Sequence, residues 1–144
     1  EGLLTMGPIW DFNGSLGNAD YFESWERAGW HYENPEFPAD NPNGFHWYAQ
    51  LLEDPDFTQR LKQRWNQHRS GPWSDDQLTA DIDSTAALLQ QAQARNFERW
   101  PVLGEYVWPN DFAAEERSTY QEEIDYLKQW LLARTTWLDE QLRD

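Results

Sequence analysis

One short stretch combines residue types that bind metal ions and phosphates, GPIWDFNGSLGN at positions 7–18. Asp11 follows an apolar segment and precedes Phe12, Asn13 and Gly14. A carboxylate in this position, held by a turn, can bind a Mg²⁺ ion that bridges the phosphates of a nucleotide. Asp followed by Asn-Gly is also typical of tight hairpin turns. Spacing alone leaves two interpretations of Asp11, a metal ligand or a turn residue.

Other known sequence motifs for metal binding or catalysis lack residues that these motifs require. Asp11, Asn13 and Ser15 alternate like the ligands of a calcium-binding EF-hand loop. The sixth position of that loop would be Leu16 instead of Gly, and the twelfth would be Phe22 instead of Glu. The histidines lie far apart, and no nucleophile-elbow, Walker A or His-Glu-x-x-His sequence occurs. The chain has no cysteine, which excludes disulfides and thiolate metal sites.

The composition is that of a folded, acidic and tryptophan-rich chain. Its 144 residues suffice for one domain with a core, and it contains ten tryptophans. The net charge of -15 repels nucleic acid and anionic membranes, so we expect neither as a partner. No apolar run approaches the length of a membrane-spanning helix. The opening residues carry neither an initiator Met nor a signal peptide, and we expect a longer parent protein.

Hydrophobic periodicity predicts a mainly α-helical chain. Asp54 before Pro55, and Ser74 three residues before Gln77, are typical of helix N-termini. We expect four helices, near residues 45–53, 55–69, 74–98 and 113–142. The expected core consists of Leu61, Trp65, Leu78, Ile82, Leu89, Ile124, Leu127 and Leu131. Trp130 and Trp137 are expected to flank the apolar face of the last helix.

The first third of the chain has a different pattern. Residues 3–12 are apolar and broken by Gly7-Pro8, which predicts a short β element. A turn-rich loop with many aromatic residues follows to about residue 44. Loops of this length in a compact domain usually carry function, so we place the candidate site at its beginning.

Four blocks of sequence together resemble the C-terminal part of the CotH family, the spore coat protein H-like atypical protein kinases of bacteria. The blocks are MGPIWDFNGSLGNADY (6–21), WYAQLLEDPDFTQRLKQRWNQHR (47–69), NFERWPVLGEYVWPN (96–110) and YQEEIDYLKQWLLARTTWLDEQL (120–142). The resemblance covers nearly the whole chain in the same order. It implies that residues 1–144 form the helical C-terminal lobe of an atypical kinase-like fold. Residues 1–44 would hold the metal-site strand and long aromatic loop, and 45–144 the helical part.

The resemblance also implies a chemistry for the opening stretch. Trp-Asp-Phe-Asn resembles the kinase Asp-Phe-Gly element, so Asp11 is implied as a ligand of Mg²⁺ and nucleotide. Asn13, which stands where many relatives have a second Asp, is implied as the other metal ligand. The family's nucleotide-binding lobe and catalytic loop precede this stretch, so no catalytic residue is assigned within the chain. We therefore expect the chain alone to be inactive and to bind neither Mg²⁺ nor ATP tightly.

For the intact parent, the resemblance implies ATP-dependent protein phosphorylation with Mg²⁺ and ATP as cofactors. The implied partners are the preceding part of the same protein and a protein substrate, and the implied location is extracellular or at the bacterial cell or spore surface. Two other functions stay open on the residues. A carbohydrate-associated binding module would stack sugar rings on exposed tryptophans, with Trp25, Trp30, Trp73 and Trp108 as candidates. The other is a structural helical module without catalysis.

Overall fold

The structure, a computed structural model, describes residues 8, 12–33 and 46–143. The α-helices in this part of the chain are α1 (His46–Glu53), α2 (Pro55–Arg69), α3 (Asp75–Leu88), α4 (Gln90–Arg99) and α5 (Tyr120–Gln141). Three short 3-10 helices accompany them, η1 (Phe12–Gly14), η2 (His31–Glu33) and η3 (Phe112–Glu116). No β-strand occurs among the described residues, and the predicted mainly α class is confirmed. The β element expected near 3–12 lies outside them, apart from Pro8 and Phe12, and Phe12 begins η1.

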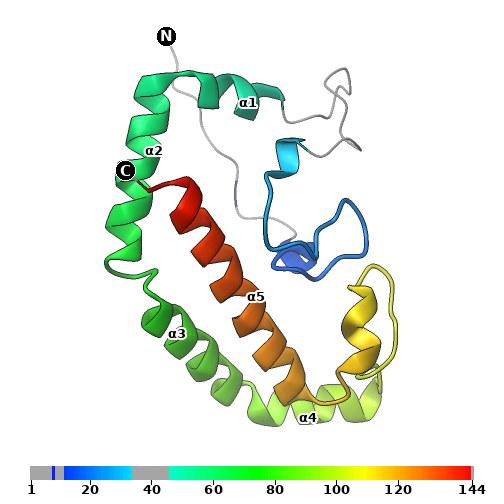
Figure 1. The fold of residues 1–144 in the computed structure, drawn as a ribbon. Coiled ribbons are helices and arrows are strands. Elements are labelled where there is room, and N and C mark those ends of the chain that lie inside the picture. Colours follow the sequence, from blue (N-terminus) through cyan, green and yellow to red (C-terminus); the bar gives the residue numbers. More distant parts are fainter. Residues whose placement is uncertain (1–7, 9–11, 34–45, 144) are drawn as a thin grey trace.

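The helices form a curved frame around one long central helix (Figure 1). α1, α2, α3 and α4 follow one another along the outside of this frame, and α5 runs back across it (Figure 1). α3 packs against α5, and α1 packs against both α2 and η2. The loop of residues 12–33 lies on the side of α5 that faces away from α3 (Figure 1). α5 therefore lies between α3 and the first part of the loop of residues 12–33, whereas η2 at the end of this loop contacts α1.

Local sequence signals explain where α2 and α5 begin. The Asp54 side chain accepts hydrogen bonds from the backbone N–H groups of Asp56 and Phe57, and Pro55 occupies the first turn. The bounds predicted for α2 are therefore confirmed. Thr119 and Glu122 form a reciprocal capping box at the start of α5. These caps satisfy backbone N–H groups that have no partner within the helix.

Two predicted helices have different bounds in the structure. The helix expected over 74–98 is divided into α3 and α4 at Leu89. Leu88 is 83% exposed and Leu89 is 44% exposed, so no packing there favours a straight continuation. α4 instead turns across the N-terminal end of α5, where Phe97 contacts Tyr120. The helix expected from 113 begins at 120, because Thr119 is extended and caps α5.

The predicted core is only partly correct. The assignment of Leu89 to the core is wrong, since this residue is exposed. The other predicted core residues are partly rather than fully buried. Trp130, expected at the flank of the last helix, is instead buried at 7% exposure. Ala19, Ala114 and Leu142 are the other buried apolar residues among those described. The best-buried contacts thus lie between α5 and the loops beside it, not between α2, α3 and α5.

A polar cluster joins α2 to the C-terminal half of α5. Arg69 donates to both carboxylate oxygens of Asp139, with Nη2–Oδ2 at 2.8 Å and Nε–Oδ1 at 2.9 Å. The Trp65 indole N–H donates to the same carboxylate at 2.8 Å. Arg69 Nη2 also pairs with Asp75 at the start of α3, at 2.8 Å. One guanidinium therefore holds three helices in register, with the bidentate geometry that gives strong charge-assisted hydrogen bonds.

Replacing Asp139 by Asn is expected to lower the free energy of unfolding at pH 7 by about 1.5–3 kcal/mol, the range for hydrogen bonds to charged groups. Partial burial acts to raise the pKa of Asp139, but the hydrogen bonds from Arg69 and Trp65 lower it below its ordinary value. The contribution of Asp139 is therefore present above the unfolded pKa of about 3.9 and is lost as pH falls through the folded pKa. Urea unfolding of both proteins between pH 7 and pH 2.5 measures the difference, which should become smaller toward the acidic end.

Asp125→Asn is the matched control for this experiment. Asp125 lies on the same helix, is exposed, and accepts a hydrogen bond only from Gln121 among the described residues. Its replacement should change the unfolding free energy by less than about 0.5 kcal/mol at any pH. A loss at Asp139 that does not vary with pH would mean that the carboxylate charge is not what stabilises the cluster.

Candidate functional site

The structure tests the two predicted metal ligands unequally. Asp11 lies outside the described residues, so its assignment stays a prediction. Asn13 is described and exposed in η1, which begins directly after Asp11. Its backbone carbonyl oxygen accepts a hydrogen bond of 3.0 Å from the side-chain amide of Asn18. The chain therefore turns back on itself immediately after the predicted ligand.

The turn after Asp11 is closed by local hydrogen bonds. Both the backbone N–H and the hydroxyl of Ser15 donate to the carbonyl oxygen of Phe12, at 3.0 and 2.6 Å. Asn18 N–H donates to the Ser15 carbonyl at 3.2 Å, across Leu16 and Gly17. Both central residues have positive φ, 57° at Leu16 and 84° at Gly17, which is typical of a type I′ turn. Leu16 adopts this left-handed conformation at a cost of about 1–2 kcal/mol.

The turn packs directly against α5. A Cβ atom at Gly17 would lie only 2.4 Å from Cδ1 of Trp130, so glycine allows the backbone to touch the indole ring. The Tyr126 hydroxyl, one turn earlier on α5, donates to the Gly17 carbonyl oxygen at 3.3 Å. The Trp130 indole N–H donates to the carbonyl oxygen of Trp25 at 2.9 Å. α5 thus holds the loop of residues 12–33 at two points, Gly17 in its first half and Trp25 in its second half.

A buried ion pair fixes the segment before α5 beside this turn. Arg117 is 7% exposed and Asp111 is 5% exposed, and their charged groups lie 3.2 Å apart. Arg117 also donates to Glu123 at 2.9 Å and lies over the ring of Tyr126, 3.9 Å from its centroid. Burial, together with the negative charge of Asp111, raises the pKa of Tyr126 to about 12. The Tyr126 hydroxyl therefore stays protonated, as its hydrogen bond to Gly17 requires.

A cavity of about 320 Å³ lies between the turn and α5. It is lined by Phe12, Asn13, Ser15, Leu16, Asn18, Glu123, Ile124, Tyr126 and Leu127. The turn supplies amide and hydroxyl groups to its wall, and α5 supplies one carboxylate and apolar side chains. Asn13 therefore lies at a recess with oxygen ligands of the kind that Mg²⁺ prefers.

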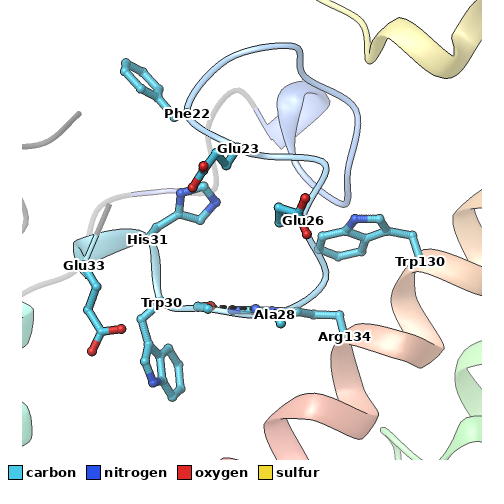
Figure 2. A pocket seen from close by; sticks show the side chains of 10 residues that line it. Phe22, Glu23, Glu26, Ala28, Trp30, His31, Glu33, Trp130 and Arg134 are labelled. Carbon is cyan, nitrogen blue, oxygen red and sulfur yellow. Dashed lines mark hydrogen bonds between the residues drawn. The ribbon is translucent and has the colours of Figure 1, made fainter. Parts of the chain in front are cut away.

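A second cavity, of about 230 Å³, lies farther along the same loop (Figure 2). Arg134 reaches from α5 toward the loop, one turn after Trp130 on the same face (Figure 2). Its Nη1 donates to the carbonyl oxygens of Gly29 at 2.8 Å and Arg27 at 3.2 Å. Burial and the positive charge of Arg134 lower the pKa of His31, which also lines this cavity. Arg134 thus fixes the second half of the loop on α5.

The described residues alone do not make a complete metal site. No group of three or more histidine, aspartate or glutamate side chains able to hold a metal ion occurs within residues 12–33 and 46–143. Glu123, the carboxylate that lines the cavity beside the turn, is already paired with Arg117. Mg²⁺ in phosphoryl-transfer sites is usually held by one or two carboxylates together with substrate phosphates and water. Among the described residues this region offers the exposed Asn13 amide, while its predicted carboxylate ligand, Asp11, lies outside them.

The four tryptophans named as candidate sugar-stacking residues divide into two groups. Trp108 is 72% exposed and Trp73 is 43% exposed. Trp25 and Trp30 are partly buried; the Trp25 carbonyl binds Trp130, and the Trp30 ring meets Trp137 edge to face. The Trp73 ring also stacks on His68, with the ring centroids 4.4 Å apart, so Trp108 is the most open of the four.

Sequence reasoning missed the residues that fix the loop on α5. Gly17, Trp130, Arg117 and Arg134 were not singled out for any role at the site. A glycine followed by Asn18, shortly after a turn sequence, was the one local signal for a left-handed backbone position. The partners of Trp130 and Arg134 lie more than 100 residues away, and those of Arg117 lie six residues before and after it.

In this mainly helical chain, the long helix α5 supports the turn of residues 12–18. Comparison with known families finds that the CotH kinase protein family matches residues 1–138. The chain belongs to the CotH family. No curated protein and no solved structure matches it. Within the described residues, no helix is both long and apolar enough to span a membrane.

Proposed function

We propose that the chain is the helical C-terminal lobe of a CotH-like protein kinase. In this proposal Asp11 and Asn13 bind Mg²⁺ that carries ATP, and the helical part forms one side of the platform for a protein substrate. The match of the CotH kinase protein family over residues 1–138 supports the class of protein. The observation that carries the proposal is the fixed turn that follows Asp11, with Asn13 exposed beside a cavity.

The geometry supports a positioning role for α5. A metal ligand needs to be held to within about 0.5 Å of its productive position, and rigid helices hold such groups better than free loops. The turn after Asp11 is closed by its own hydrogen bonds and is attached to α5 through Gly17. When bound, Mg²⁺ neutralises the charge that develops on the transferred phosphate. In this proposal, the chain's own contribution is to position Asp11 and Asn13.

Phosphoryl transfer also needs parts that the resemblance places before this stretch in the family. A nucleotide lobe and a catalytic loop orient ATP and the acceptor, and such positioning supplies much of the rate. The proposal therefore makes the preceding part of the same protein the first partner, and Mg²⁺ and ATP cofactors of the intact protein. A protein substrate at the bacterial cell or spore surface belongs to the same proposal. By itself the chain has no catalytic residue and is inactive in this account.

Transfer of labelled phosphate from ATP distinguishes this function from a non-catalytic one. The intact protein is expected to label itself or a casein acceptor in the presence of Mg²⁺ and to stop when EDTA is added. The chain of residues 1–144 alone is expected to give no transfer above the level without protein. The measurement is incorporated phosphate against time at equal protein concentration. A folded intact protein that binds ATP but transfers no phosphate would contradict the proposal.

A further inference from the structure

We infer that a cavity beside the C-terminal half of α5 binds a small aromatic carboxylate, with Arg134 as the partner of the carboxylate group. The cavity has a volume of about 400 Å³ and is lined by residues of the loop of residues 12–33, α2, α3 and α5. This volume lies in the range that is usual for small-molecule sites, which often lie between helices. The inference goes beyond the proposed kinase function and does not depend on it.

The wall of this cavity is mostly apolar and comes from distant parts of the chain. Trp65 on α2 and Trp73 in the turn before α3 have ring centroids 5.9 Å apart. Further apolar side chains come from α3 and α5, namely Leu78, Trp130, Leu131 and Leu138. Indole rings and branched aliphatic side chains provide flat apolar surface at low entropic cost. This wall therefore favours a ligand with a flat apolar body.

The charge of the cavity favours a negative ligand. None of the described residues that line it is acidic, although the chain has 26 acidic residues and a net charge of -15. By contrast, three glutamates line the cavity of about 230 Å³, and Glu123 lines that of about 320 Å³. Burial and the charge of Arg134 lower the pKa of His31, so this lining residue is neutral at pH 7. Arg134 is therefore the one charged group among the described lining residues, and it is complementary to an anion.

Arg134 keeps hydrogen-bond donors for such a ligand. Its Nη1 donates to the carbonyl oxygens of Arg27 and Gly29, whereas its Nε and Nη2 donate to no described residue. It also forms no ion pair with a described carboxylate. Arg69 uses the equivalent Nε and Nη2 edge to hold both oxygens of Asp139, at 2.9 and 2.8 Å. The same edge of Arg134 can therefore hold the carboxylate of a ligand in this bidentate way.

Arg134 also lies where two apolar cavities share lining residues. Arg134 and His31 line a further cavity of about 370 Å³, formed by residues of η2, α1, α2 and α5. The Trp137 ring lies against the guanidinium, with its centroid 4.6 Å from Cζ, and this contact helps to fix the orientation of the group. A ligand at Arg134 therefore contacts the loop and the helices together, and its binding should stabilise their association.

Isothermal titration calorimetry of the intact protein with two matched ligands tests the inference. 2-Naphthoate carries the carboxylate, and 2-naphthylmethanol has the same rings without a charge. The dissociation constant of 2-naphthoate should be about 1 mM or lower, as is usual for a ligand of this size. The alcohol should bind at least about tenfold more weakly, because it cannot form the charge-assisted bonds to Arg134. Equal affinities for the two ligands, or no binding of 2-naphthoate up to about 10 mM, would overturn the inference.

Arg134→Gln tests the role of the guanidinium, with Arg95→Gln as its control. Arg134→Gln should weaken the binding of 2-naphthoate at least about tenfold and change that of the alcohol less than about twofold. Arg95 is exposed on α4 and does not line the cavity, so its replacement removes the same charge and should change neither affinity by more than about twofold. An equal loss of both ligands in Arg134→Gln would mean that Arg134 only supports the loop, and would overturn the inference.

Leu78→Trp locates the binding site and is independent of Arg134. A larger side chain in the wall of the cavity should weaken the binding of 2-naphthoate at least about tenfold, because it occupies the space of the ligand. Leu88→Trp is the matched control, since Leu88 lies on the same helix and is 83% exposed. Its affinity for 2-naphthoate should stay within about twofold of the wild-type value. Unchanged binding in Leu78→Trp would place the ligand elsewhere and overturn the inference, even if Arg134→Gln does not fold.

Discussion

Asp11→Asn is expected to reduce phosphoryl transfer by the intact protein by about 100-fold or more without changing its fold. The side chain keeps its size but loses the negative charge that a Mg²⁺ ligand provides. Removal of one group that stabilises the charge of a phosphoryl-transfer transition state typically costs about 10²–10³ in rate. A single polar residue in a turn contributes little to stability, so the change in unfolding free energy should stay near 0.5 kcal/mol. Initial rates at saturating Mg²⁺ and a urea titration measure the two quantities.

Asp20→Asn provides the comparison for Asp11→Asn. Asp20 lies in the same loop and accepts a hydrogen bond from the Tyr106 hydroxyl, away from the cavity beside Asn13. Its replacement removes the same charge from the loop and should leave the transfer rate within about twofold. If Asp11→Asn and Asp20→Asn have equal and small effects, Asp11 is a turn residue. The second interpretation of the opening stretch then holds.

Local signals predicted the parts of the fold that depend on neighbours in sequence. α2 begins and ends where Asp54, Pro55 and the apolar spacing indicated, because the cap and the periodicity act within a few residues. The capping box of Thr119 and Glu122 is equally local, yet the start of α5 was placed seven residues too early. The apolar and acidic residues before Thr119 have helical character, and they form the separate η3. Helix propensity alone could not show that η3 and α5 are separate helices.

Non-local contacts explain what the sequence could not predict. The burial of Trp130 depends on Gly17 and Trp25, which lie more than 100 residues away. The division of the third predicted helix at Leu89 follows from the position of α5, which α4 crosses. Periodicity assigns an apolar face to a helix but does not say which loop covers that face. The metal-site prediction was made from the residues around Asp11, and only Asn13 of the two ligands lies in the described part.

The few basic residues of this acidic chain show how the loop and helices are held together. The chain has 11 lysine and arginine residues against 26 acidic ones. Arg69, Arg117 and Arg134 each use their guanidinium within the fold, and each contacts α5 or projects from it. Arginine suits this role because its planar group makes several hydrogen bonds and stacks on aromatic rings. These three arginines therefore position α5 and the loops beside it.

Trp130→Ala is expected to lower the free energy of unfolding by about 3–5 kcal/mol, the usual cost of truncating a buried aromatic side chain. The ring is 7% exposed, touches the Gly17 backbone, and donates a hydrogen bond to the Trp25 carbonyl oxygen. Its removal leaves a cavity between α5 and the loop and an unpaired carbonyl group, so the two costs add.

Trp108→Ala is the control for size and residue type, since Trp108 is 72% exposed. Its loss should cost less than about 1 kcal/mol, because little buried area disappears with an exposed side chain. Urea unfolding monitored by circular dichroism avoids the change in tryptophan fluorescence that both variants introduce. Equal losses for the two variants would mean that Trp130 does not hold the loop on α5. The contact with Gly17 could not then position the turn that follows Asp11.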